Sequence, residues 1–185
     1  MSDIQPWPIK GTREIGDFRI FKLRADHKVS PRNDHEMEFI VVECVNWVNI
    51  VALTTEGEFV MVQQYRHGSA TVETEIPGGV MDPEDTDPVH TAIRELREES
   101  GYEGTNARVI GQVFSNPAIM NNTTYTVLIE NCEKKHALEL DPGEDLRPLS
   151  LPKEKVYEMV SKGEIRHSLV VAALFHYELM EKSGS

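Results

Sequence analysis

The sequence has few cysteines and no long hydrophobic run, and both absences narrow the class of protein. Its only cysteines are Cys44 and Cys132, each in apolar surroundings. Two such residues do not form a disulfide framework, so we expect reduced thiols in or near a core. No apolar stretch approaches the ~20 residues of a membrane-spanning helix. The segment Met1–Lys10 lacks the basic flank and apolar stretch of a secretion signal. These features predict a cytoplasmic protein without a membrane partner.

Positive charge is also scarce. The chain carries 19 Lys and Arg against 31 Asp and Glu, which gives a net charge of −12. An acidic surface argues against binding a nucleic-acid backbone. It does not exclude a small anionic substrate, because a metal ion can supply positive charge locally. The length of 185 residues fits one well-buried domain and is short for two.

The order of predicted elements is several strands, one helix, more strands and two closing helices. We expect an arm over residues 1–14, N-terminal strands over 15–45 and a main domain over 46–182. The closing helices are expected over about 152–162 and 168–181. Because strands and helices do not alternate, an α+β fold with a mixed sheet and flanking helices is favoured over a parallel doubly wound sheet. β-branched and alternating segments predict the clearest strands at 18–23, 37–45, 47–53, 59–62, 107–114 and 123–131.

The clearest helix is predicted from Pro88 to about Ser100. Asp87 is suited to the N-cap position, and Pro88 is suited to the first helical position. Gly101 stands where a helix-ending glycine belongs. Apolar residues at positions i, i+3, i+4 and i+7 predict one apolar stripe on this helix, made of Val89, Ala92, Ile93 and Leu96.

Three glutamates on this helix suggest a metal site. Glu95 and Glu99 are four residues apart, so they point the same way at the edge of the apolar stripe. Glu98 lies further round, one turn from Arg94. Neighbouring carboxylates repel each other, and Mg²⁺ or Mn²⁺ relieves the repulsion by binding their oxygens. Such a helix also suits a solvated face with ion pairs, so the helix alone leaves both interpretations open.

The segment before the helix supports the metal interpretation. It contains Pro77-Gly78-Gly79, and small residues let backbone approach a ligand closely. Together with the run from Arg94 to Tyr102, it resembles the Nudix box, which is a glycine, five residues, glutamate, seven residues, then Arg-Glu-apolar-x-Glu-Glu-x-Gly-apolar. The second half matches at every specified position. In the first half the box requires glutamate at position 85, where the chain has Asp85, and Arg94 comes one residue late. The loop Asp82–Asp87 therefore carries one extra residue, and either Glu84 or Asp85 substitutes for the glutamate.

The resemblance covers roughly residues 15–180. The chain is similar in particular to ADP-ribose pyrophosphatases and nucleoside-diphosphate-sugar hydrolases. Gln63-Gln64-Tyr65-Arg66, the run from Glu75 to Gly79 and the stretch at 15–45 carry it. It implies a Nudix-type α/β/α sandwich preceded by an antiparallel β-stretch that exchanges between the subunits of a homodimer. It also implies metal-dependent hydrolysis of the pyrophosphate of substrates such as ADP-ribose or GDP-mannose, yielding a nucleoside monophosphate and a sugar phosphate.

This resemblance assigns roles to several residues. Glu95 and Glu99 would be the main ligands of Mg²⁺ or Mn²⁺. Glu98 would assist them as a further ligand or as a catalytic group. The backbone carbonyl of Gly78 would complete the set, and Arg94 would orient the glutamates.

Other roles concern substrate and proton transfer. Arg66 would hold phosphate through its forked guanidinium. The general base of this branch lies on a late acidic loop, where Glu144 is our choice and Glu139 the reserve. A loop that includes Asn116 would face the substrate. The aromatic candidates for stacking on a base, each also suited to the core, are Phe18, Trp47 and Tyr65.

Three other functions remain open on the sequence. One is hydrolysis of nucleoside triphosphates or damaged nucleotides, against which the N-terminal stretch and the Glu144 loop weigh. Another is a non-catalytic nucleotide-binding module, against which the retained Glu95, Glu98 and Glu99 weigh. A third is an interaction protein whose acidic helix is merely surface. The preferred base, the preferred sugar and the number of metal ions also stay open.

Overall fold

The computed structural model describes residues 4–82 and 84–184. The chain divides into two units, and each is described by itself. The first unit contains Met1–Val45 and Phe114–Asn122, and the second contains Asn46–Val113 and Thr123–Ser185. Among the described helices, none is long and apolar enough to cross a membrane.

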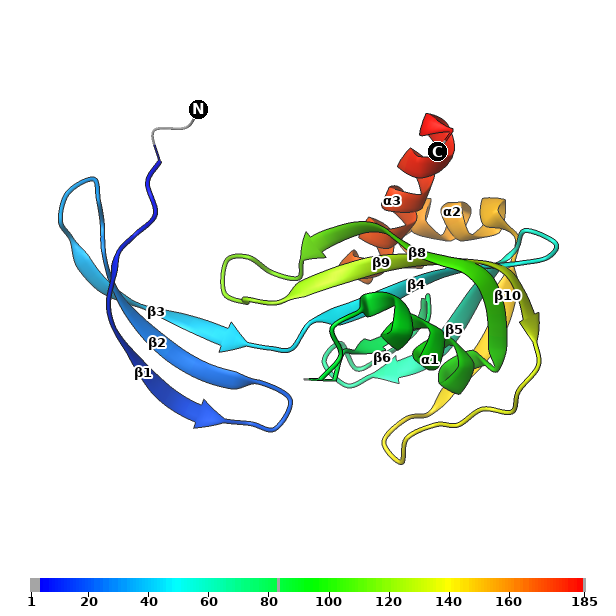
Figure 1. Ribbon diagram of the computed structural model, residues 1–185, viewed down its shortest axis with the longest axis horizontal. Coiled ribbons are helices and arrows are strands. Elements are labelled where there is room, and N and C mark those ends of the chain that lie inside the picture. Colours follow the sequence, from blue (N-terminus) through cyan, green and yellow to red (C-terminus); the bar gives the residue numbers. More distant parts are fainter. Residues whose placement is uncertain (1–3, 83, 185) are drawn as a thin grey trace. The chain divides into compact units, whose positions relative to one another are not determined.

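The first unit is a three-stranded antiparallel sheet in the order β1-β2-β3, formed by Ile9–Asp17, Lys22–Val29 and Glu36–Glu43 (Figure 1). This sheet is the antiparallel N-terminal β-stretch that the sequence predicts. β1 begins inside the segment 1–14 that was expected to be an arm. The strand expected at 18–23 is largely a turn instead, in which the Phe18 N–H donates to the Phe21 carbonyl at 2.9 Å.

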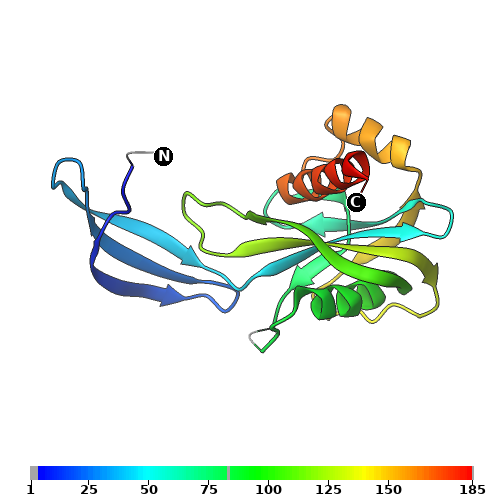
Figure 2. The ribbon, with the colours of Figure 1, turned by 45° about the horizontal axis from the view of Figure 1, so that its top comes forward.

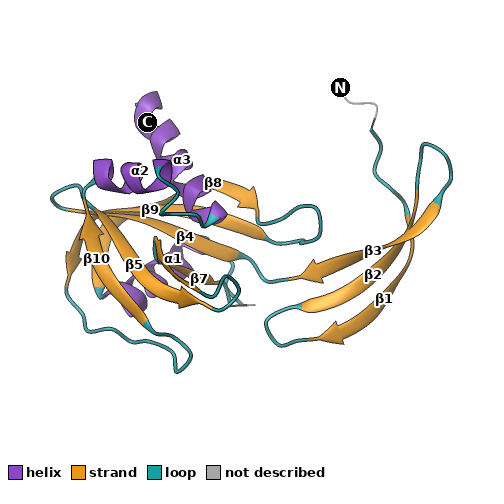
Figure 3. Cartoon of the chain, turned by 180° about the vertical axis from the view of Figure 1, so that it is seen from behind, coloured by secondary structure: helices purple, strands orange, loops and turns teal. Residues whose placement is uncertain are grey.

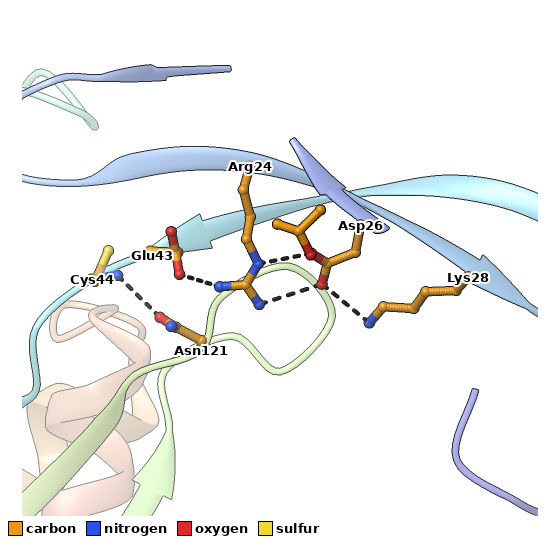
Figure 4. Close-up of polar contacts among 7 residues, drawn as sticks. Arg24, Asp26, Lys28, Glu43, Cys44 and Asn121 are labelled. Atoms are coloured by element: carbon orange, nitrogen blue, oxygen red, sulfur yellow. Dashed lines mark hydrogen bonds and ion pairs between the residues drawn. The ribbon is translucent and has the colours of Figure 1, made fainter. Parts of the chain in front are cut away.

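An ionic cluster centred on the buried Asp26 links the three strands of this sheet (Figure 4). Arg24, Asp26 and Lys28 alternate along β2 and therefore share one face. The Asp26 side chain is 1% exposed; it accepts hydrogen bonds from Arg24 Nε at 2.9 Å and from Thr12 Oγ1 of β1 at 3.0 Å. Arg24 also pairs with Glu43 of β3. The hydrogen bond from Arg24 is the main cause that holds the pKa of Asp26 below its ordinary value.

The loop Phe114–Asn122, which belongs to this unit, is attached at the end of β3. Asn121 Oδ1 accepts a hydrogen bond from the Cys44 N–H at 3.0 Å (Figure 4). Val42 and Met120 form a parallel bridge next to it. Cys44 is a free, partly buried thiol, and the other cysteine, Cys132, is free and buried in the second unit. The burial of Cys132 and the partial burial of Cys44 agree with the expected positions in or near a core.

The second unit is a seven-stranded mixed sheet between helices (Figures 2 and 3). The path β10-β5-β4-β9-β8 is joined by β6 on β5 and by β7 on β4. β4 and β9 run parallel, whereas β4 is antiparallel to β5 and to β7. The strands are Trp47–Thr54 (β4), Phe59–Arg66 (β5), Thr71–Glu75 (β6), Gly78–Val80 (β7), Tyr102–Phe114 (β8), Thr123–Lys134 (β9) and Leu146–Leu151 (β10).

Helices cover both faces of this sheet, which confirms the α/β/α sandwich. Helix α1 (Pro88–Ser100) lies on one face, while α2 (Lys153–Ser161) and α3 (Ser168–Ser183) lie on the other (Figure 2). The central strand β4 is buried on both sides. Its Val51 packs toward α2 and α3, and the adjacent Ile50 packs toward α1. The alternation of side chains along a strand therefore builds two apolar cores on one sheet.

Helix α1 has the bounds and the caps that the sequence predicts. The Asp87 side chain accepts a hydrogen bond from the Val89 N–H at 2.9 Å, and Gly101 has a φ of 72°. The predicted apolar stripe is wrong at Ile93, which is 45% exposed. The face toward the sheet is centred on Ala92, Leu96 and Glu99 instead, and Ile93 is rotated by about 100° from Ala92 on a helix.

Candidate active site

The glycines of β7 bring the backbone against two glutamates of α1. The Gly78 N–H donates to Glu99 Oε2 at 2.9 Å, and Glu99 is 3% exposed. A Cβ atom on Gly79 would lie 2.3 Å from the carboxyl carbon of Glu95, and one on Gly78 would lie 2.4 Å from the Val48 carbonyl oxygen. A side chain at position 78 would therefore collide with the backbone of β4, and one at position 79 would displace the Glu95 carboxylate from its present place. Glu95 and Glu99 therefore share one side of α1, as their spacing predicts.

Burial makes these two carboxylates poor holders of negative charge. Loss of solvent raises the pKa of Glu99 to about 8, although the Gly78 hydrogen bond acts in the opposite direction. Loss of solvent likewise raises the pKa of Glu95 to about 7, with Arg94 opposing it. The charge of Glu144 contributes to both increases. A cation between these carboxylates would relieve an unfavourable concentration of negative charge.

Arg94 lies between the glutamates of the helix. Its Nη1 atom is 2.9 Å from Glu95 Oε1 and 2.9 Å from Glu98 Oε2. Its Nη2 atom is 3.8 Å from Asp82 Oδ2, in the loop before the helix. Glu98 is thus one turn from Arg94, as expected, and Arg94 can fix the orientation of both carboxylates.

Asp85 supports the loop that carries the extra residue. Its Oδ2 atom accepts hydrogen bonds from Thr91 Oγ1 at 2.7 Å and from the Asp82 N–H at 3.2 Å. The bond from Thr91 is the main cause that lowers the pKa of Asp85. Glu84, the other candidate to replace the glutamate of the box, is exposed, and Pro83 lies outside the described residues.

Arg66 at the end of β5 is held by a buried partner that the sequence did not reveal. Its Nε and Nη2 atoms contact the two carboxylate oxygens of Glu75 at 2.9 and 2.7 Å, and Glu75 is 2% exposed. This pairing is the main cause that raises the pKa of Arg66, and the charges of Glu99 and Glu144 add to it. Glu75 stands in the Glu-Ile-Pro-Gly-Gly run, which marked the family likeness but indicated no ion pair.

The two candidates for the general base have different surroundings. Glu144 is exposed and its carboxylate accepts a hydrogen bond from the Asp141 N–H at 3.0 Å. Its charge acts on Glu95, Glu99 and Arg66. Glu139 pairs with Arg97 at 2.8 Å on the outer side of α1. The electrostatic environment therefore favours Glu144 as the carboxylate that faces the glutamate pair.

The candidates for base recognition are dispersed. Tyr65 is 48% exposed and its ring lies edge-on to His67 with 5.2 Å between centroids, whereas Trp47 is partly buried on β4. Phe18 and Asn116 belong to the first unit. Phe18 stacks on Phe21 at 5.2 Å, and the Asn116 carbonyl accepts from the Met120 N–H at 2.8 Å.

The carboxylates of α1 fit a hard divalent cation whose remaining ligands are waters and substrate phosphates. Within residues 4–82 and 84–184, no group of three or more His, Cys, Asp and Glu side chains forms a ready metal cage. Mg²⁺ is usually held by one or two carboxylates together with waters and substrate phosphates, so it does not need such a cage. Glu95 and Glu99 supply a buried carboxylate pair of this kind beside a strand of glycines.

Comparisons with known proteins concern the family and the fold of this chain. The NUDIX domain family matches residues 45–174. A methanol dehydrogenase activator of Bacillus methanolicus is 29% identical over 92% of this chain and 91% of its own. An ADP-ribose pyrophosphatase of Mycobacterium tuberculosis is 30% identical over 84% of this chain and 75% of its own. A crystal structure described as an ADP compounds hydrolase covers 100% of this chain and 99% of its own, with a TM-score of 0.84 and 19% identity. That last similarity concerns the fold.

Proposed function

Because the chain belongs to the NUDIX family of hydrolases, we propose that it hydrolyses the pyrophosphate bond of a nucleoside diphosphate sugar, with ADP-ribose as the first candidate. The observation that carries this proposal is the buried Glu95–Glu99 pair against the glycines of β7. The pyrophosphatase from M. tuberculosis supports an adenosine-containing substrate. GDP-mannose is the second candidate.

Several residues are proposed to hold a divalent ion. Glu95 and Glu99 would bind Mg²⁺ or Mn²⁺ directly, with the Gly78 carbonyl and Glu98 as further ligands. When bound, the ion would neutralise charge on the diphosphate and lower the pKa of water. Arg94 would keep the carboxylates of Glu95 and Glu98 in place through its contacts of 2.9 Å with each.

The chain's own residues would then position the substrate and move a proton. Arg66, preorganised by its two contacts with Glu75, would bind phosphate oxygens of the substrate. Glu144 would accept a proton from the attacking water. Attack at one phosphorus breaks the bond to the bridging oxygen and gives a nucleoside monophosphate and a sugar phosphate. Glu144 is exposed on a loop, and an exposed loop suits this role because the active site must admit substrate and release products.

We also propose that the N-terminal sheet forms a homodimer. β1 is an edge strand, and all its residues are exposed except Gly16, which is partly buried. An exposed edge strand offers unpaired backbone groups to another chain, and a second copy of the same sheet is the simplest symmetric partner.

A panel of substrates tests the activity and its specificity. Hydrolysis of ADP-ribose, GDP-mannose, UDP-glucose and GTP would be followed by phosphate release in a coupled assay and by identification of the products. We expect AMP and ribose 5-phosphate from ADP-ribose with Mg²⁺. Cleavage of GTP alone would instead support a triphosphate hydrolase. Turnover of none of the four would support a non-catalytic binding module.

A further inference from the structure

The segment between β9 and β10, yellow in Figure 1, is fastened to the end of α1 through its backbone. The N–H groups of Lys135 and His136 donate to the Gly101 carbonyl at 2.9 and 3.0 Å. The Glu139 N–H donates to the Glu98 carbonyl at 2.9 Å. The last carbonyls of a helix have no partner within the helix, and the carbonyl of Glu98 obtains one from this segment. Residues 135–139 therefore follow the end of α1.

An ion pair adds a side-chain contact at the last of these points. Arg97 Nη2 lies 2.8 Å from Glu139 Oε1, and both side chains are about half exposed. The two residues line a cavity of about 300 Å³ together with Arg94 and Glu98. The ion pair therefore lies beside two residues that we assign to the proposed metal site.

The other end of the segment is fixed by the sheet. Leu146, the first residue of β10, is buried and pairs with Gln64 of β5. Between the two fixed ends, the Glu144 N–H donates to the Asp141 carbonyl at 2.9 Å, and the Asp141 N–H donates to Glu144 Oε2 at 3.0 Å. Glu144 thus stands in a short turn between an anchor on α1 at Glu139 and an anchor on β5 at Leu146.

These attachments relate the proposed general base to the proposed metal ligands. Glu95 and Glu99 lie on α1, and the charge of Glu144 acts on both. A general base must lie within hydrogen-bond reach of the attacking water, and the carboxylates that would organise the reaction centre lie on α1. A displacement of about 1 Å can lower the rate by ~10²-fold. Glu144 therefore needs a constant position relative to α1.

We propose that the Arg97–Glu139 ion pair is a latch that holds the Glu144 turn in position on α1, and that Arg97 and Glu139 are positioning residues. Among the hydrogen bonds and ion pairs described for residues 84–184, those of Glu139 are the last with α1 before the turn begins at Asp141. The side chain of Glu139 thus controls how the chain leaves the helix. The inference rests on the proposed function, because it takes Glu144 as the general base.

An exposed ion pair stabilises one conformation only modestly. Pairs of this kind change an equilibrium by a factor of up to about 5, so neutralising one partner gives a small effect. Reversing one charge replaces the attraction with repulsion, because Arg97→Glu would face Glu139 and Glu139→Arg would face Arg97. Charge reversal is therefore the sharper test.

The test is a charge swap in ADP-ribose hydrolysis. Arg97→Glu and Glu139→Arg should each lower kcat by roughly 5-fold or more, with little change in KM, because neither residue is assigned to substrate binding. The double variant Arg97→Glu/Glu139→Arg should regain at least half of the original kcat, because opposite charges face each other again. The matched control is the Arg108–Glu130 pair, 2.6 Å apart on β8 and β9, whose reversals and swap should leave kcat unchanged.

A second measurement follows the segment itself and does not depend on catalysis. Amide hydrogen exchange of residues 137–145 should become faster in each single reversal and return toward its original rate in the swap. Exchange in the buried strand β4 should be the same in all variants, and a change there would reveal a folding defect.

Unchanged kcat in both single reversals, no recovery in the swap, or a raised KM with unchanged kcat would overturn the latch. Unchanged exchange of residues 137–145 would overturn it as well. If the unaltered protein cleaves no nucleoside diphosphate sugar, the proposed function fails, and the role of the latch in catalysis fails with it. The exchange experiment still shows in that case whether the ion pair holds the segment, so the two failures are distinguishable.

Discussion

Glu144 and Glu139 are both acidic residues of the stretch between β9 and β10, and they differ in what their charges meet. The charge of Glu144 acts on Glu95 and Glu99, whereas Glu139 is neutralised by Arg97 at 2.8 Å. A general base needs access to water and to the reacting phosphorus, not a permanent ion pair. We therefore propose Glu144 as the general base and keep Glu139 as the reserve.

We expect Glu144→Gln to lower kcat much more than it changes KM, because it removes a proton acceptor and keeps the shape of the side chain. General base catalysis contributes typically ~10²–10⁴-fold. Steady-state kinetics with ADP-ribose measure this, with Asp145→Asn as a neighbouring control. A normal kcat for Glu144→Gln, together with a depressed kcat for Glu139→Gln, would transfer the role to Glu139.

The buried glutamates also predict how stability depends on pH in the absence of metal. Burial raises the pKa of Glu99 to about 8 from an ordinary value of 4.5. The folded chain then binds more protons than the unfolded chain, so this contribution to stability is complete below pH 4.5 and lost as the pH rises through 8. In EDTA, the melting temperature should fall more steeply between about pH 5 and about pH 8 for the unaltered protein than for Glu99→Gln. Parallel pH profiles would show that Glu99 is not desolvated.

At the scale of elements, the contact of β7 with α1 brings the residues of the proposed site together. Gly79→Ala should displace the Glu95 carboxylate, because the added Cβ would lie 2.3 Å from its carboxyl carbon. We expect kcat/KM to fall by ~10²-fold, as displacements of about 1 Å can cause. Gly11→Ala is the control, since its Cβ meets nothing within 4 Å. Unchanged kinetics for Gly79→Ala would mean that Glu95 can move without loss of function.

Sequence predicts elements well where their signals are local. Helix α1 was predicted with its ends, because Asp87 and Gly101 act on the residues next to them. β1 was missed because its side chains are nearly all exposed and carry no apolar alternation. β6 was missed because it buries Glu73 and Glu75, whose partners Arg166 and Arg66 come from other segments.

The candidate site shows the same division between local and distant signals. The spacing of Glu95, Glu98 and Glu99 indicated a carboxylate cluster, because it lies within one helix. The anchoring of Arg66 by Glu75 and the anchoring of Arg166 by Glu73 depend on the pairing of β5 with β6 and on the fold that brings Arg166 to β6. No local pattern carries that information, so these features required the structure.

At the scale of the whole molecule, the loop 114–122 joins the N-terminal sheet through contacts that are distant in sequence. Asn121 bonds to the backbone of Cys44, which is 77 residues away. The boundary that the sequence predicts at residue 45 therefore leaves out the segment Phe114–Asn122, which also belongs to the first unit.

The proposed homodimer belongs to this scale as well. We expect light scattering to give a mass near twice the 21.0 kDa of one chain. Ile15→Lys on β1 should shift the protein toward monomer, because it places a charge on the exposed edge strand. Val171→Lys on α3, also at an exposed aliphatic side chain, is the control. A monomeric mass for the unaltered protein at micromolar concentration would argue against the dimer.

The most direct test of the central claim is ADP-ribose hydrolysis with Mg²⁺, with EDTA and by Glu99→Gln. We predict that AMP and ribose 5-phosphate form only with the metal, and that Glu99→Gln lowers kcat/KM by at least ~100-fold, since even residues that merely support metal ligands contribute 10–100-fold. Glu103→Gln, at an exposed carboxylate that pairs with His136, should retain full activity. Equal turnover in EDTA, or full activity of Glu99→Gln, would contradict the account.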